Sequence, residues 1–254
     1  MDPNALVNID RFVQGMEKVD DIIRRENPDI IIAPMMGANP FIDVLNILNE
    51  DFPNHKVEYV PASSRLEDPK KVMRNAFYQI IKEHQEKKYL SIDEVVSGNS
   101  AERVHKQFNA ALMQYANEET LRLFGETADF TKENVRNYRD SIIKEHEYKT
   151  IGIEDERILK RKKERNPEYK ELLKKGIAIP VPVGTIPTMD RPSLMPWKYE
   201  ATKNKKFLPR VSKIEYNQEY IDFLKVVAGI AGKNPNEVEI KNIAKIMNAY
   251  KTES

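Results

Sequence analysis

Residues 88–100, KYLSIDEVVSGNS, carry the pattern that decides the fold of this 254-residue chain. The part up to Asp93 is a short run rich in Tyr, Leu and Ile, which is typical of a buried strand. A loop of mostly small and polar residues follows over 94–100, and helical spacing of apolar residues runs from Ala101 to about Leu123. A strand that leads through a short loop into a long helix is the repeating unit of a layered α/β fold.

The same unit occurs twice earlier in the chain. Short apolar runs at 29–34 (DIIIAP) and 57–61 (VEYVP) each precede a segment of helical spacing, over 41–48 and 70–87 respectively. An amphipathic helix over 5–25 comes before all of them. This order predicts an α/β fold with a mainly parallel sheet flanked by helices, in which ligands gather at the carboxyl ends of the strands.

The middle of the chain has weaker signals. Helical spacing dominates from residue 131 to about Tyr148, and again over 155–175. Residues 176–185 have the composition of a strand interrupted by prolines, which places it at the edge of the sheet or in a hood over it.

The last part is irregular and then helical. Residues 186–210 are rich in proline, and 217–250 predict two helices separated by a Gly-Lys-Asn-Pro turn, which belong to the core or to a homodimer contact. We therefore expect a core over 1–150, with a basic helix, a hood segment and C-terminal helices of 151–254 packed on it.

Composition excludes several classes of protein. There is no cysteine, which removes disulfides, thiolate catalysis and cysteine zinc sites, and the four histidines form no short ligand pair. No apolar run is long enough for a bilayer span, and no signal peptide is visible, so we expect a soluble cytoplasmic protein with no membrane contact. The dinucleotide-binding and P-loop glycine motifs are both missing from the sequence.

Charge is uneven along the chain. Residues 157–213 hold 16 lysines and arginines against 5 acidic residues, whereas residues 1–156 carry a net charge of −9. A basic block of this kind attracts polyanions, so it is a candidate surface for nucleic acid or for an acidic protein partner. The alternative is a solvated helix face.

The turn after Asp93 has the residues that a ribose phosphate needs. Successive amides at a helix N-terminus with small side chains bind phosphate, and the Ser97 and Ser100 hydroxyls can add hydrogen bonds. The carboxylates of Asp93 and Glu94 can hold ribose hydroxyls directly or through Mg²⁺, which prefers carboxylate, water and phosphate oxygens. The alternative is that the acidic pair only complements the dipole of the following helix.

This turn resembles the phosphoribosyl pyrophosphate (PRPP) binding motif of the type I phosphoribosyltransferase family. That motif is a hydrophobic strand, two acidic residues, two apolar residues and a Thr/Ser-Gly-x-Thr/Ser loop. The acidic pair corresponds to Asp93 and Glu94, with Glu where Asp is usual, and the shorter loop corresponds to Ser97, Gly98, Asn99 and Ser100. The resemblance covers about residues 10–125.

The resemblance also implies a pyrophosphate-binding loop after the first strand. The backbone of Met36, Gly37 and Ala38 would bind the pyrophosphate, and Asn39 is a reasonable N-cap for the helix that follows. In the family a flexible loop with a cation covers the leaving group, and the matching cations here are Arg65 and Lys71.

The implied activity is that of a glycosyltransferase. A nitrogen nucleophile would displace pyrophosphate at ribose C1 of PRPP, with Mg²⁺ held by Asp93 and Glu94 as cofactor. A variable hood selects the base in the family, and its candidates here are Asp190 and Trp197. Two other hypotheses stay open: a non-catalytic nucleotide- or nucleic-acid-binding module on the same fold, and an effector in a multi-protein assembly.

Overall fold

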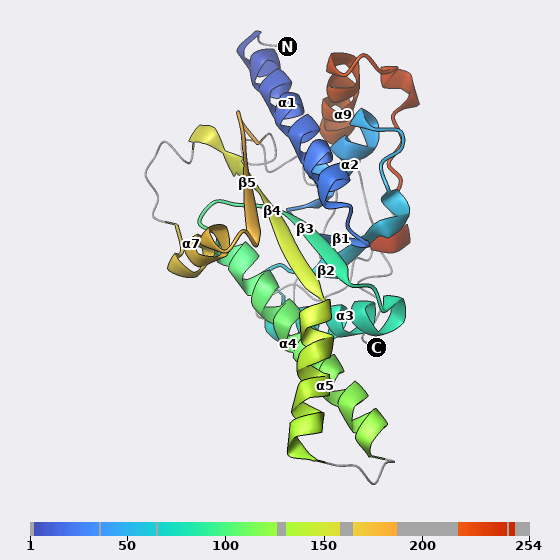
Figure 1. Ribbon diagram of the computed structural model, residues 1–254. Helices are drawn as coiled ribbons and strands as arrows, with labels where there is room; N and C mark the ends of the chain where they lie inside the picture. Colours follow the sequence, from blue (N-terminus) through green and yellow to red (C-terminus); the bar gives the residue numbers. More distant parts are fainter. Residues whose placement is uncertain are drawn as a thin grey trace.

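The computed structural model describes residues 3–35, 37–64, 66–125, 131–157, 165–186, 218–242 and 244–246. They form one five-stranded, all-parallel sheet with helices on both faces (Figure 1), so the predicted α/β architecture with a parallel sheet is confirmed. In space the strands follow the order β2-β1-β3-β4-β5, and their bounds are β1 Ile30–Met35, β2 Val57–Pro61, β3 Lys88–Glu94, β4 Glu147–Asp155 and β5 Ala178–Val183.

Helices cover the sheet in two layers. One face carries α1 (Pro3–Glu26), α2 (Asn39–Leu48) and α9 (Gln218–Ile230), whereas the other carries α3 (Pro69–His84), α4 (Asn99–Phe124) and α7 (Pro167–Lys174). The outer half of α4 and helix α5 (Lys132–Glu145) extend away from the sheet as a hairpin (Figure 1). Short 3-10 helices lie at Asn54–Lys56 and Pro235–Glu237, and none of the described helices is long and apolar enough to cross a membrane.

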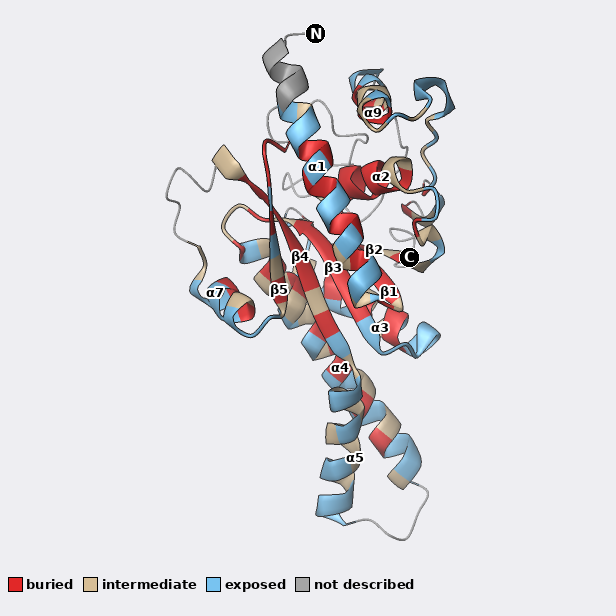
Figure 2. Ribbon diagram, turned by 45° about the horizontal axis from the view of Figure 1, so that its top comes forward, coloured by how far each residue is buried: buried red, intermediate tan, exposed pale blue. Residues whose placement is uncertain are grey.

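Strands β1, β3 and β4 are buried along most of their length (Figure 2), whereas β5 has exposed residues at Pro180 and Pro182. In β1, Ile31 and Ala33 belong to the apolar layer under α1 and α2, whereas Ile30 and Ile32 belong to the layer under α3 and α4. A parallel strand that is covered on both faces needs a continuous apolar run, which explains why DIIIAP could be identified from sequence.

The sheet opens between β1 and β3 at their carboxyl ends. β1 pairs with β2 as far as Met35, but its pairing with β3 ends at Ile32. Pro34 has no N–H to donate, and its carbonyl accepts from the Ala38 N–H at 3.2 Å, so Pro34 does not extend the ladder to β3. The strand order also reverses direction here, and a parallel sheet binds ligands at such a switch point.

The strand β4 corrects one sequence prediction. Helical spacing predicts a helix as far as about Tyr148, but α5 ends at Glu145 and Glu147–Asp155 is a strand. The pattern misled because Lys149 and Gly152 interrupt the apolar run of this strand. β4 contains residue 150, the predicted domain boundary, and continues the same sheet on both sides of it.

The remaining predictions for the second half have mixed outcomes. β5 is one of the two edge strands of the described sheet, as its prolines predict. Helix α9 lies within the predicted 217–250 segment. Of the second helix predicted there, residues 235–242 hold a 3-10 turn and irregular chain, residues 244–246 are helical, and residues 247–250 lie outside the described residues.

Candidate functional site

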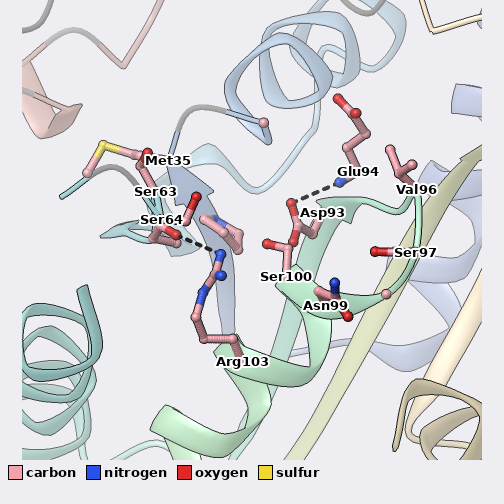
Figure 3. A pocket seen from close by; sticks show the side chains of 14 residues that line it. Met35, Ser63, Ser64, Asp93, Glu94, Val96, Ser97, Asn99, Ser100 and Arg103 are labelled. Atoms are coloured by element: carbon pink, nitrogen blue, oxygen red, sulfur yellow. Dashed lines mark hydrogen bonds between the residues drawn. The ribbon is translucent and has the colours of Figure 1, made fainter. Parts of the chain in front are cut away.

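A cleft of about 280 Å³ lies at the carboxyl ends of β1, β2 and β3, where the sheet opens. Figure 3 shows its side chains in close-up. The lining residues come from the last residues of β1 and β3, from the loops after the three strands and from the first two turns of α4: Pro34, Met35, Gly37, Ala62, Ser63, Ser64, Asp93, Glu94, Val96, Ser97, Gly98, Asn99, Ser100 and Arg103.

Most of the residues predicted from the sequence meet at this cleft. Its lining includes the acidic pair, the whole predicted phosphate loop and one glycine of the loop after β1, namely Asp93, Glu94, Ser97, Gly98, Asn99, Ser100 and Gly37. Ala38 is fully buried and is not part of the lining. Lys71 is exposed on the first turn of α3 and does not line the cleft either.

Some predicted site residues cannot be placed. Met36, Arg65, Asp190 and Trp197 lie outside the described residues. So does most of the basic 157–213 block. Of its described cations, Arg157 pairs with Asp155, Arg165 with Glu154 and Lys174 with Glu171.

Gly98 sets the shape of the turn between β3 and α4. Its φ of +87° lies in the left-handed region, which side-chain-bearing residues rarely adopt. A Cβ atom at this position would lie 2.3 Å from Cγ of Tyr169 on α7. Both the backbone conformation and the close approach of α7 therefore require glycine here.

Helix α7 braces this turn from outside. The Asn166 backbone N–H donates to the Ser97 carbonyl at 2.8 Å, and the Asn166 side-chain amide donates to Asn99 Oδ1 at 2.7 Å. Tyr169, which is fully buried, packs beneath Gly98. The turn is thus held in place by a segment about seventy residues later in the chain, a contact that the sequence pattern does not reveal.

The two helices that begin at the cleft lack side-chain caps. Asp68, Thr131 and Asn166 accept hydrogen bonds from the first turns of α3, α5 and α7, but in the described chain α2 and α4 have no such bond. The first-turn N–H groups of α4 are therefore available to an anion, whereas α2 offers fewer, because Pro40 has no N–H and the Phe41 N–H donates to the Ala38 carbonyl at 3.0 Å.

The predicted N-cap of α2 is wrong. The N-cap position is occupied by Ala38, and Asn39 is the first helical residue. The Asn39 side chain is only 1% exposed, and neither of its polar atoms has a hydrogen-bond partner among the described residues.

Asp93 is a buried carboxyl group with one oxygen unused. It is 4% exposed, and its Oδ1 accepts from the Glu94 N–H at 2.9 Å. Its Oδ2 has no hydrogen-bond partner in the described part of the chain. Burial raises the pKa of Asp93 to about 6, although the Ser100 hydroxyl, the Glu94 N–H and the charge of Arg103 act in the opposite direction.

Glu94 is less buried than Asp93, but more negative charge from neighbouring residues acts on its pKa. Burial, the neighbouring Asp93 and the more distant Asp155 together raise the pKa of Glu94 to about 7. Two adjacent carboxyl groups with pKa values near neutrality lose their protons more readily when a cation binds between them.

The acidic pair fits a magnesium ion only if the ligand shares in its coordination. No group of three or more His, Asp or Glu side chains suited to a metal occurs among the described residues. Mg²⁺ is commonly bound through one or two carboxylates together with water and substrate phosphates. The unpartnered Asp93 Oδ2 is the oxygen that would serve it.

Arg103 is a site residue that the sequence motif missed. It lies one helical turn after Asn99 and lines the cleft beside Ser100. Its Nη2 donates to the Ala62 carbonyl at 3.3 Å, and its Nε is buried without a partner among the described residues. The spacing of four residues from Asn99 was the available signal, because it places Arg103 on the same face of the helix.

Comparisons of the chain with models of protein families, with curated proteins and with solved structures gave no match.

Proposed function

We propose that the cleft binds a ribose 5-phosphate ligand, PRPP or a nucleotide, together with Mg²⁺, and that the protein is a phosphoribosyltransferase-like enzyme acting at ribose C1. One observation carries the proposal: a buried carboxyl group with an unused oxygen lies beside the uncapped start of α4, in a cleft at the switch point of a parallel sheet. A site for phosphate alone would have no need of two carboxyl groups.

The turn of residues 97–101 is the proposed phosphate site. The N–H groups at the start of α4 and the hydroxyls of Ser97 and Ser100 donate to the phosphate oxygens. The left-handed Gly98 allows the close approach of Tyr169 on α7, and Asn166 keeps the loop in its shape. Asp93 and Glu94 then face the sugar and accept hydrogen bonds from its hydroxyls.

Mg²⁺ bound by Asp93, Glu94 and ligand oxygens would neutralise charge on the departing pyrophosphate. In the proposed step the bond from C1 to the pyrophosphate oxygen breaks, with its electron pair leaving on oxygen, and a bond from C1 to nitrogen forms. The nucleophile loses one proton. Glu94 is the proposed acceptor, because its carboxylate lines the cleft beside the proposed position of the sugar.

Thermal unfolding with PRPP and Mg²⁺ tests the proposal. A ligand at one hundred times its dissociation constant stabilises the fold by about 2.7 kcal/mol. We expect this shift in the parent protein and its loss in the variant Asp93→Asn/Glu94→Gln. The control Glu50→Gln/Asp51→Asn removes an equally charged pair from the end of α2, outside this cleft, and should keep the shift.

A parent protein that shows no shift with PRPP or with nucleotides would contradict the proposal. If it is instead stabilised by nucleic acid, and less so as salt rises, the binding-module alternative is favoured. Release of pyrophosphate in the presence of nitrogen bases separates an enzyme from a binding protein.

A further inference from the structure

Helix α9 is held on α2 by polar contacts at both of its ends. Near the start of α9 the Tyr220 hydroxyl donates to Asp43 Oδ2, and just after its end the Lys233 ammonium group pairs with Glu50. The two helices pack together on one face of the sheet (Figure 1). Lys233 and Glu50 meet at the surface, whereas Asp43 and Tyr220 are only 5% and 0% exposed, so the two contacts differ in their surroundings.

The carboxyl group of Asp43 lies in an otherwise apolar layer. Its neighbours in the α2 sequence, Ile42 and Val44, belong to the same buried apolar cluster as Phe223 of α9. Among the described residues, Tyr220 is the only hydrogen-bond donor to the Asp43 side chain. A buried carboxylate needs several donors or a cation to replace the water it loses, whereas a neutral carboxyl group needs far fewer. The contact therefore suits the neutral form of Asp43 and not its anion.

In the described chain, no charged side chain lies where it could neutralise an anion at Asp43. The charged residues of α9 are exposed or half-buried, namely Glu219, Asp222 and Lys225. The one buried charged residue of α1, Asp20, bonds to Asn49 at the far end of α2, and β1 and the rest of α2 carry no charge. Burial raises the pKa of Asp43 to about 7, although the Tyr220 hydroxyl acts in the opposite direction.

We propose that Asp43 and Tyr220 form a proton-controlled latch, in which the neutral carboxyl group keeps α9 docked on α2 and loss of its proton to water loosens the helix. When the first turn of α9 lifts, the ionised carboxyl group gains the water that burial denies it. The contact at the other end does not respond in the same way. Glu50 stays ionised at neutral pH, because its hydrogen bond to Lys233 lowers its pKa. The latch does not depend on the ligand of the cleft.

The direction of the pH effect follows from the docked and lifted forms of α9. In water the Asp43 carboxyl group has the ordinary pKa of about 4, whereas in the docked form its pKa is about 7. Docking therefore favours the protonated form. Its contribution is fully present below the ordinary pKa and is lost as the pH rises through about 7. Between pH 5 and pH 8 we expect the opening equilibrium of α9 to rise by about tenfold or more.

Amide hydrogen exchange of the full-length chain at pH 5 and pH 8, corrected for the chemical exchange rate at each pH, measures this opening. We expect the protection of the α9 amides to fall by about tenfold or more. Asp43→Asn keeps an acceptor for the Tyr220 hydroxyl but cannot ionise, so its α9 protection should be the same at both pH values. The control Asp222→Asn removes an exposed carboxylate from α9 itself and should keep the fall.

Low concentrations of urea separate opening of α9 from unfolding of the whole chain. Exchange through a local opening is nearly independent of urea, whereas exchange through global unfolding rises steeply with it. At pH 8 we therefore expect urea to accelerate exchange in β1 and to have little effect in α9.

The latch is overturned if α9 protection does not change with pH, or if the fall persists in Asp43→Asn. It is also overturned if α9 and β1 show the same urea dependence at pH 8, because Asp43 would then act only on global stability. Should Asp43→Asn fail to fold, Tyr220→Phe answers the same question. It removes the hydroxyl that lowers the pKa of Asp43, so the fall in α9 protection should move to higher pH, and an unmoved fall would refute the latch.

Discussion

Two turns with the same topology meet at the cleft, and they differ in chemistry. The β1–α2 turn and the β3–α4 turn each leave a buried strand and enter a helix without a side-chain cap. The β3–α4 turn carries the acidic pair and a left-handed glycine, and α7 braces it. The β1–α2 turn has no charged residue over 35–39. The common topology provides the crevice, whereas the side chains and the brace give one turn its proposed ligand chemistry.

The largest difference should appear when each turn loses its glycine. Gly98→Ala forces a side chain into a left-handed backbone and against Tyr169, and we expect a loss of about 2–4 kcal/mol of unfolding free energy. Gly37 has no positive φ, and its added Cβ would meet Asp93 Oδ1 at 3.3 Å, so Gly37→Ala should cost less than about 1 kcal/mol. Urea unfolding of both variants measures this, and equal losses would show that the two turns are not distinct.

The next effect concerns the charge of the β3–α4 turn. The folded-state pKa of Asp93, about 6, lies above its ordinary value, so the proton is held more tightly in the folded protein. The contribution of protonated Asp93 to the free energy of unfolding is fully present at low pH and is lost as pH rises through about 6. Asp93→Asn should therefore be more stable than the parent by about 1–3 kcal/mol at pH 8, with a gain from this source of only about 0.5 kcal/mol at pH 4.

Urea unfolding at the two pH values measures this gain. The exposed Asp51→Asn serves as the control, and it should leave the difference between pH 4 and pH 8 unchanged. A gain for Asp93→Asn that is the same at both pH values would contradict the assignment of a raised pKa.

A smaller effect should follow from removing the brace. Asn166→Ala deletes the side-chain bond to Asn99 and the cap of α7, at a cost of about 1 kcal/mol. Amide hydrogen exchange should become faster at residues 97–101 and stay unchanged at 37–39. Equal acceleration at both turns would mean that α7 supports the whole sheet edge rather than this turn.

The sequence predicts features that lie within one continuous stretch of residues, but it does not predict contacts between residues that are far apart in the chain. The run from Asp93 to Ser100 could be identified because strand, acids, small residues and helix follow one another directly. The brace could not, because Asn166 and Asn99 are 67 residues apart and meet only through the fold. Arg103 was missed because it lies beyond the motif, on the helix.

Strand β4 was missed for a related physical reason. Its Gly152 interrupts the apolar run, yet a Cβ atom there would lie 2.4 Å from the Tyr169 hydroxyl. The residue that weakens the strand signal is thus the one that makes room for the Tyr169 side chain beneath the β3–α4 turn. The hydrophobic pattern within β4 cannot reveal that Gly152 is needed to make room for Tyr169 of α7.

We propose that the turn of residues 97–101 holds a sugar phosphate. The most direct measurement is a titration of isotope-labelled protein with ribose 5-phosphate, followed through backbone amide chemical shifts. We expect the largest chemical-shift changes on the amides of residues 98–101, and we expect them to saturate with ligand. Saturable shifts confined to other parts of the chain, or no saturable shift at all, would contradict it.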